Sequence, residues 1–267
     1  MSVLLKKNGP LEYLQAEHIP VPHCFTTRLG GVSSGALSSM NLGLRLADDP
    51  ENVAENVRIL SRELGFDPED LVTPRQIHSD MVLKVTRADR GKHLIHGASR
   101  EGDALITNEP GVALVVFTAD CTPILLHDPV TGAVGAVHAG WRGTASGIAA
   151  KAVRAMADSY GCEPKNIRAA IGPNIGRCCF ETDGDVPAAL RAALGPDTEA
   201  FITQKGPKYH VDLKQVNALW LQRAGVTQIE ISTHCTACRQ DLFWSHRKVG
   251  LNRGSQGAII YCKEVQL

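Results

Sequence analysis

Short apolar runs bounded by turn residues recur along the chain, and they restrict its fold more than any other feature. Six such runs, rich in β-branched residues, predict strands at residues 112–118, 124–127, 133–138, 168–172, 229–232 and 258–262. The turn-forming segment 128–132 separates the second run from the third, so residues 123–138 predict a β-hairpin.

Helical patterns with their own start and stop signals accompany these strands. Three helices are expected to begin after a capping side chain and to end at a glycine. The capping residues are Asp49, Ser146 and Asp212, and the terminating glycines are Gly65, Gly161 and Gly225. A shorter helix is expected at residues 186–194. Hairpins mixed with isolated helices favour an α+β fold of mixed β-sheets with flanking helices. No repeat, low-complexity stretch or linker divides residues 1–267, which are expected to form a single domain.

The composition excludes several classes of function. Lys plus Arg and Asp plus Glu both number 28, so the chain lacks the positive charge that nucleic acids or anionic membranes attract. No apolar run approaches the roughly 20 residues that span a bilayer. Lys6 and Lys7 are followed by Asn8-Gly9-Pro10 instead of the apolar stretch of a signal peptide. We therefore expect a cytoplasmic protein whose eight cysteines are reduced.

Three residues at strand ends or in loops have side chains suited to metal chemistry. They are His78, Cys121 and His138. Two histidines and a thiolate suit catalytic zinc, which keeps a fourth position for water or substrate and lowers the pKa of that water to about 7. Cys121 could instead be a thiolate nucleophile activated by His138. A buried cysteine and two hydrogen-bonded histidines that only pack are a third interpretation.

Several neighbouring residues are candidates with an ordinary structural alternative. Asp120 could orient a ligand or bind substrate, or it could end a strand. The glycines around Trp141-Arg142 could hold an anion with exposed N–H groups, or they could form a tight turn. Glu181 could be a general acid or base, although most glutamates are solvated. Arg247 could bind phosphate or carboxylate, or belong to a solvated charge cluster.

A C-x-x-C motif at Cys235 and Cys238 suggests redox or metal chemistry. A single motif of this kind without a second pair or a thioredoxin-like setting predicts a structural or incidental role.

The motifs taken together resemble those of the YfiH-like family, also called the laccase-domain, multicopper polyphenol oxidase or peptidoglycan editing factor family. Matching segments run along almost the whole chain in the same order. They are Phe25-Thr26-Thr27-Arg28, Gly30-Gly31-Val32-Ser33, Met40-Asn41-Leu42-Gly43, Gln76-x-His78-Ser79, Gly102-Asp103-Ala104, Ala119-Asp120-Cys121-x-Pro123, His138-Ala139-Gly140-Trp141-Arg142-Gly143, Ile171-Gly172-Pro173, Cys179-x-Glu181 and Phe243-x-Ser245-x-Arg247.

The resemblance implies a fold similar to that of Cys–His deamidating toxins, with a metal bound by His78, Cys121 and His138. The metal is usually zinc, and copper is the alternative. It implies phosphorolysis of adenosine, inosine, guanosine and methylthioadenosine, with adenosine deamination, so the expected ligands are a purine nucleoside and phosphate. Asp120, Cys121, His138 and Glu181 are the catalytic candidates. The substrate- and phosphate-binding candidates are Arg28, Asn41, Gln76, Arg142 and Arg247.

The resemblance also leaves two rival functions open. Some family members are linked to the removal of a misincorporated serine from cell-wall precursors, which predicts a Cys121 or zinc hydrolase. A metal- or nucleotide-binding module without turnover is the other alternative. Multicopper oxidation fits less well, because only His78 and His138 fall in matching motifs. Family tails commonly carry paired arginines and a Thr-Gly-Arg step, whereas this chain has Arg247-Lys248 and Asn252-Arg253-Gly254. Lysine cannot reproduce a bidentate arginine contact.

Overall fold

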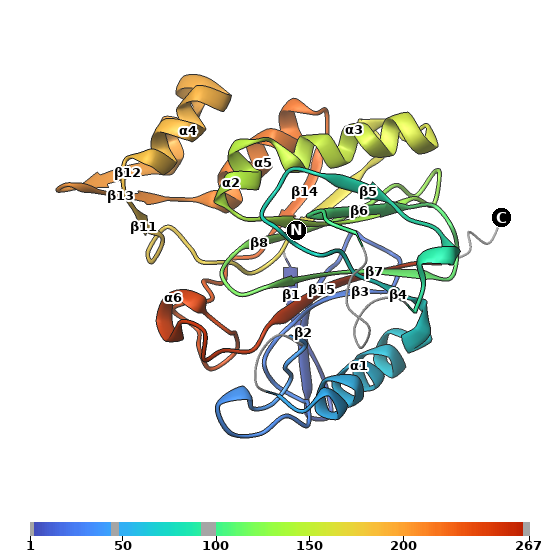
Figure 1. The fold of residues 1–267 in the computed structure, drawn as a ribbon. Coiled ribbons are helices and arrows are strands. Elements are labelled where there is room, and N and C mark those ends of the chain that lie inside the picture. Colours follow the sequence, from blue (N-terminus) through green and yellow to red (C-terminus); the bar gives the residue numbers. More distant parts are fainter. Residues whose placement is uncertain (1–2, 44–47, 92–99, 264–267) are drawn as a thin grey trace.

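The computed structural model describes residues 3–43, 48–91 and 100–263, which form an α+β domain in four layers. Two six-stranded sheets lie face to face, with α1 (Pro50–Leu64) on one outer side and α3 (Ile148–Tyr160) on the other (Figure 1). The predicted fold of mixed sheets with flanking helices is therefore confirmed.

The first sheet joins the two ends of the chain. Its strands lie in the order β1 (Val3–Asn8), β2 (Leu11–Ala16), β3 (His23–Thr26), β15 (Gln256–Cys262), β7 (Val112–Thr118) and β4 (Leu71–Val72). The C-terminal strand β15 is antiparallel to both β3 and β7. Successive residues of β7 point to opposite faces: Leu114 packs between the two sheets, and Val115 packs against α1. Both faces of this sheet are thus covered.

The second sheet contains the predicted hairpin. Its order is β14 (Gln228–Ile231), β10 (Arg168–Ile171), β8 (Thr122–His127), β9 (Val134–Ala139), β6 (Ala104–Thr107) and β5 (Val82–Lys84). The β8–β9 hairpin pairs Thr122 with Ala139 and Pro123 with His138. On β9, Val134 and Ala136 face the first sheet, whereas Val137 and Ala139 face α3 and α5 (Leu213–Arg223). By this alternation His138 lies on the inner face, at the end of the strand.

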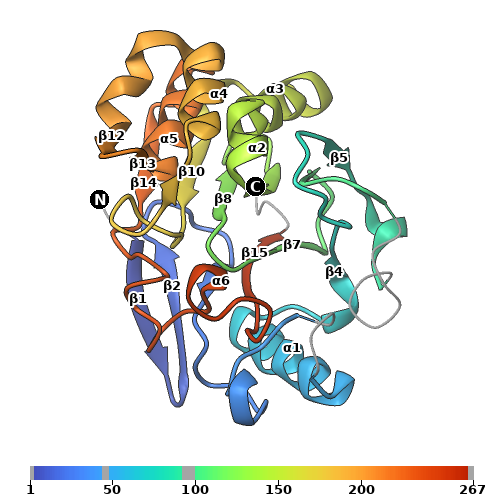
Figure 2. The ribbon, with the colours of Figure 1, turned by 60° about the vertical axis from the view of Figure 1, so that its left-hand side comes forward.

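Smaller elements extend from the two large sheets. A third sheet, β11 (Glu181–Thr182), β13 (Lys208–Val211) and β12 (Ile202–Lys205), accompanies α4 (Asp185–Leu194). The short helices α2 (Trp141–Ala145) and α6 (His246–Val249) lie in the left half of Figure 1, and both come near the middle of the view in Figure 2, where that side is turned forward. Short 3₁₀ helices occur at Gly35–Leu37, Pro68–Asp70, Arg87–Asp89, Pro164–Asn166 and Gly195–Phe201. Among the described residues, no helix is both long and apolar enough to cross a membrane.

Local signals predicted most of the helix boundaries. Asp49 caps α1 through the N–H of Glu51, and Asp212 accepts from the N–H of Gln215 at the start of α5. The predicted cap at Ser146 is wrong. Ser146 ends α2, and Gly147, in the left-handed conformation, precedes α3.

The alternative of a tight turn around Trp141-Arg142 is also wrong, because these residues form α2. The short helix packs closely on its neighbours. A Cβ at Gly143 would lie 2.8 Å from the carbonyl oxygen of Ser79, and one at Gly147 would lie 3.2 Å from the ring of Trp220. These two glycines therefore allow the backbone within and directly after α2 to pack directly on Ser79 and Trp220, without a side chain between them.

Candidate metal centre

His78, Cys121 and His138 converge at one end of the second sheet. His78 lies in the loop before β5, Cys121 directly precedes β8, and His138 is near the end of β9. Because β8 and β9 pair at Pro123 and His138, the hairpin brings Cys121 beside His138. The three ligand atoms all lie within 4.8 Å of one another, and Cys121 Sγ is 3.8 Å from His78 Nε2. His138 is buried and His78 is exposed, so the group opens to solvent on the His78 side.

The Asp103 carboxylate positions both histidines, His138 through its ring and His78 through its backbone N–H. Its side chain is fully buried, and its Oδ1 is 2.8 Å from His138 Nδ1. The backbone N–H groups of Ile77, His78 and Ser79 all donate to the same carboxylate, and so does the Ser79 hydroxyl. With Nδ1 facing a carboxylate, His138 presents Nε2 to the site, as metal-binding histidines in proteins commonly do.

Backbone strain is concentrated at this centre. Among the described residues, His78 (φ 61°) and Asp120 (φ 85°) are the non-glycine residues with a left-handed φ. For His78 this conformation accompanies the convergence of three successive N–H groups on Asp103. Such strain costs about 1–3 kcal/mol per residue and persists only where the surrounding structure enforces it. It is therefore typical of a functional site.

The centre favours an ionised thiol beside a charged imidazole. Burial alone would raise the pKa of Cys121, but the charge of His138 and hydrogen bonds from both histidines outweigh it and lower that pKa. Burial would lower the pKa of His138, yet the Cys121 charge and the Asp103 hydrogen bond raise it. Burial would raise the pKa of Asp103, but hydrogen bonds from His138 and Ser79 hold it at about 2.

The donor set fits a metal ion. It offers two imidazole nitrogens and a thiolate, with solvent access at His78 for a fourth ligand. Gly140 makes room for this group, because a Cβ there would lie 2.8 Å from His78 Cδ2 and 3.4 Å from Cys121 Sγ.

Asp120, which directly precedes Cys121, contacts three other segments through its carboxylate and its backbone carbonyl. Oδ1 accepts from the Thr236 hydroxyl at 2.6 Å. Oδ2 accepts from the Ser245 hydroxyl at 3.0 Å and from the Arg247 N–H at 2.7 Å. The backbone carbonyl of Asp120 also accepts from the N–H of Ile175. Asp120 thus joins the Cys121 loop to the C-terminal segment and to the loop after β10.

Three predicted binding residues make extensive contacts within the protein. Arg28 donates to the carbonyls of Ser38 and Gln240, and its guanidinium lies 3.9 Å from the centre of the Trp244 ring. The side chain of Asn41, which is buried, accepts from the Gly43 and Ser255 N–H groups and donates to Asp48. Gln76 exchanges two hydrogen bonds with the backbone of Phe117.

The remaining predicted residues are more exposed. Arg142 stacks on Trp141, with the guanidinium 4.3 Å from the ring centre, and among the described residues its side chain makes no hydrogen bond. Arg247 donates to the carbonyls of Cys179 and Glu181. The Glu181 carboxylate is half exposed and lies 3.6 Å from His210 Nε2.

Two charged residues at this centre had no role in the sequence-based prediction. Asp103 appears in the sequence only as part of a matching motif. Its position directly before an apolar strand could have indicated a buried carboxylate with a role in the site. Arg253, in the tail that departs from the family pattern, is half-buried and lies close enough for its charge to interact with Asp120 and Cys121. No local pattern indicates this proximity.

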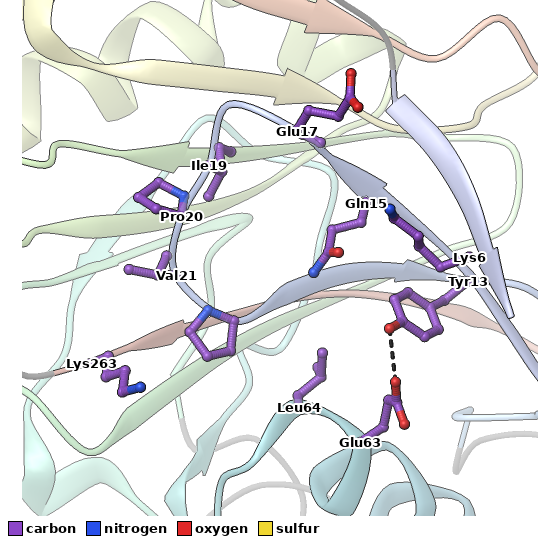
Figure 3. A pocket seen from close by; sticks show the side chains of 12 residues that line it. Lys6, Tyr13, Gln15, Glu17, Ile19, Pro20, Val21, Glu63, Leu64 and Lys263 are labelled. Carbon is purple, nitrogen blue, oxygen red and sulfur yellow. Dashed lines mark hydrogen bonds between the residues drawn. The ribbon is translucent and has the colours of Figure 1, made fainter. Parts of the chain in front are cut away.

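A separate pocket of about 550 Å³ lies between β2 and the end of α1 (Figure 3). The Tyr13 hydroxyl, which lines it, donates to Glu63 at 2.8 Å. None of the predicted site residues lines this pocket.

The fold and the centre together define a mixed α+β protein with an open His–Cys–His metal-ligand set. The chain belongs to the family described as multi-copper polyphenol oxidoreductase laccase, whose family model matches residues 22–263. Membership of this laccase-like family implies a metal.

Known proteins confirm the YfiH-like resemblance. The chain is 40% identical over 240 residues to purine nucleoside phosphorylase YlmD of Geobacillus stearothermophilus, covering 88% of this chain and 86% of the relative. It is 38% identical over 228 residues to purine nucleoside phosphorylase YfiH of Escherichia coli, covering 85% and 88%. The crystal structure of Bacillus licheniformis hypothetical protein YfiH superimposes with a TM-score of 0.91 at 37% identity, covering 97% of this chain and 99% of that one.

Proposed function

We propose that this chain is a zinc-dependent purine nucleoside phosphorylase that also deaminates adenosine. The observation that carries the proposal is the solvent-open His78–Cys121–His138 set, oriented by the buried Asp103. The two relatives above are named purine nucleoside phosphorylases, which supports the same class of substrate here. The expected substrates are adenosine, inosine, guanosine and methylthioadenosine, with phosphate as the second substrate.

Zinc is the metal that this donor set favours, with copper as the alternative, because imidazole and thiolate ligands suit both ions. When bound, zinc would supply a Lewis acid at neutral pH. His78 and His138 would bind it through ring nitrogens and Cys121 through its thiolate. Asp103 would keep the proton of His138 on Nδ1, which leaves the lone pair of Nε2 available.

Phosphorolysis also requires a group that binds phosphate, and we assign this role first to Arg142. Its guanidinium has no hydrogen-bond partner among the described residues, whereas Arg28 and Arg247 donate to backbone carbonyls. Arg142 follows Gly140, which contacts the site, by two residues. A planar guanidinium can bind a phosphate through two parallel hydrogen bonds. Arg253, whose charge interacts with Cys121 but whose guanidinium already donates to the Gly254 carbonyl and the Ser255 hydroxyl, is a second candidate.

The two carboxylate candidates differ in their freedom to move a proton. Asp120 accepts hydrogen bonds from three groups, which suits a residue that positions Cys121 and its neighbours. Glu181 is half exposed and 3.6 Å from His210, so its carboxylate remains available as a general acid or base. We therefore propose a positioning role for Asp120 and a proton-transfer role for Glu181.

Product analysis by chromatography tests the proposal. The zinc-loaded protein is incubated with adenosine, with and without phosphate, beside a Cys121→Ala variant. Adenine formed only with phosphate, inosine formed without it, and neither formed by the variant, is the expected result. Cys162→Ala is the matched control, because this buried thiol contacts Thr131 at the opposite end of the β8–β9 hairpin. No product from the intact, metal-loaded protein would contradict the proposal.

One observation favours a second candidate, a hydrolase of an amide bond in a cell-wall precursor. Cys121, His138 and Asp103 form a thiol–imidazole–carboxylate series like that which activates cysteine nucleophiles. In this case the Cys121 thiolate would attack the carbonyl carbon and His138 would protonate the leaving amine. Water would then hydrolyse the resulting Cys121 thioester, which releases a carboxylate and restores the thiolate. Release of adenine that depends on phosphate separates the two candidates, since neither amide hydrolysis nor deamination needs phosphate.

A further inference from the structure

Four cysteines from two distant segments meet beside the candidate metal centre. Cys178 and Cys179 lie in the loop after β10, and Cys235 and Cys238 lie in the loop after β14. Because β10 and β14 are parallel neighbours, the loops that follow their carboxyl ends lie at the same end of the second sheet. A bridge between Asn174 and Cys235 continues this pairing into the loops. The fold thus supplies the second cysteine pair that the C-x-x-C motif lacks in the sequence.

The spacing of the four sulfur atoms matches a tetrahedral metal site. All four lie within 4.8 Å of one another, and Cys238 Sγ is 3.5 Å from Cys178 Sγ and 3.4 Å from Cys179 Sγ. Four sulfurs bound to one zinc at about 2.3 Å would be separated by roughly 3.8 Å. A disulfide would need a separation of about 2.05 Å. The sulfurs are therefore grouped around one point and are not bonded in pairs.

The surroundings of the cluster also favour a metal. The N–H of Gly176 donates to Cys235 Sγ at 3.2 Å, a bond that stabilises a thiolate. A Cβ at Gly176 would lie 3.4 Å from Cys178 Sγ and 3.5 Å from Cys235 Sγ, so the glycine lets the backbone contact the sulfurs. Lys214, a buried lysine, donates to the carbonyl of His234, next to Cys235. Its positive charge would offset part of the net negative charge of a zinc tetrathiolate.

We propose that Cys178, Cys179, Cys235 and Cys238 form a second metal site, a closed zinc tetrathiolate with a structural role. Four protein ligands leave no open position, which distinguishes it from the His–Cys–His centre. Cys178 and Cys238 are exposed, so the ion can enter from solvent. The proposal does not depend on the nucleoside chemistry.

This second site would stabilise the loops that support the first. Thr236, between the two cysteines of the C-x-x-C motif, donates to Asp120, the neighbour of Cys121. The carbonyl of Cys179 accepts from Arg247. Binding of zinc by these loops would therefore fix the partners of Asp120, and loss of the ion would loosen the segment around Cys121.

Metal analysis of the full chain tests the proposal. The protein is purified under reducing conditions and saturated with zinc, and bound zinc is measured per chain after removal of excess ion. Three proteins are compared: the wild type, the double variant Cys178→Ser/Cys238→Ser and the single variant Cys121→Ala. We expect the double variant to lose one zinc equivalent that Cys121→Ala retains. The exposed position of both changed cysteines limits the effect on folding.

Two measurements on the wild type do not depend on any variant. X-ray absorption at the zinc edge should show a sulfur-rich first shell, above the one sulfur in three protein ligands of the His–Cys–His centre. Cobalt substitution should give strong thiolate-to-metal absorption, which Cys121→Ala keeps and the double variant loses. The same zinc content in the wild type and a folded double variant would overturn the proposal. So would a disulfide among these cysteines in the reduced protein, seen as a mass lower by two hydrogens.

Discussion

Replacement of Asp103 by asparagine should weaken both the fold and the metal centre. Oδ2 accepts from the Ser79 N–H at 2.6 Å and the Ser79 hydroxyl at 2.7 Å, and Oδ1 accepts from the His78 N–H at 3.0 Å. The asparagine oxygen is expected to replace Oδ2, so its NH₂ group must face the His78 N–H and His138 Nδ1. Breaking a buried charged pair of this kind costs about 3–5 kcal/mol of unfolding free energy.

The same substitution should change the tautomer of His138. An NH₂ group opposite Nδ1 requires that nitrogen to accept, which moves the proton of the neutral imidazole to Nε2. A protonated Nε2 cannot bind a metal, so metal affinity should fall roughly 10- to 100-fold. Denaturant unfolding of the metal-free protein measures the first effect, and competition with a coloured chelator measures the second.

Asp80→Asn is the matched control for Asp103→Asn. Asp80 lies in the same loop region and pairs with Lys151, but its side chain is 37% exposed. The same loss of charge there should cost less than about 1 kcal/mol. An Asp103→Asn protein within 1 kcal/mol of wild type, with metal affinity changed less than about twofold, would refute the reasoning.

Three further predictions test other parts of the structure. Gly140→Ala should lower metal affinity at least about tenfold, because the added Cβ would displace His78. Gly184→Ala, whose added Cβ would lie 3.7 Å from its nearest neighbour, should leave the affinity unchanged. Equal affinities of the two variants in a chelator titration would contradict this. Burial lowers the pKa of His23 to about 4, so unfolding free energy should fall by roughly 3 kcal/mol as pH drops from 6.5 through 4. His23→Gln should remove that part of the pH dependence, and unchanged unfolding curves across this range would oppose it. Arg142→Lys should raise the KM for phosphate about tenfold and leave the nucleoside KM near wild type, because lysine lacks the planar fork; steady-state kinetics would decide.

Local sequence determined the elements whose signals lie within a few residues. Asp49 and Asp212 cap helices that begin where expected, and the turn between β8 and β9 forms the predicted hairpin. The predicted cap at Ser146 is wrong because a second helix, α2, ends directly before it, so that only two residues separate α2 from α3. A serine can cap one helix or end the previous one, and packing of Gly147 against Trp220 accompanies the second outcome.

The sequence predicted the candidate metal ligands only in part. Spacing alone left His78, Cys121 and His138 open to packing, metal or nucleophile interpretations. The ordered series of family motifs, not the spacing, predicted that these three residues act together. The match to the family model supports the use of those motifs. The roles assigned to Arg142 and Glu181 remain predictions.

Only the tertiary structure decided what lies around these residues. Pairing of β10 with β14 brings Cys178 and Cys179 to the C-x-x-C motif, and Asp103 reaches His138 because β6 pairs with β9. The strands β3 and β15 are more than two hundred residues apart yet form one sheet. Caps and turns act through hydrogen bonds between near neighbours and can be seen in sequence. Strand pairing depends on burial of whole faces, so its partners become visible only when the sheets are assembled.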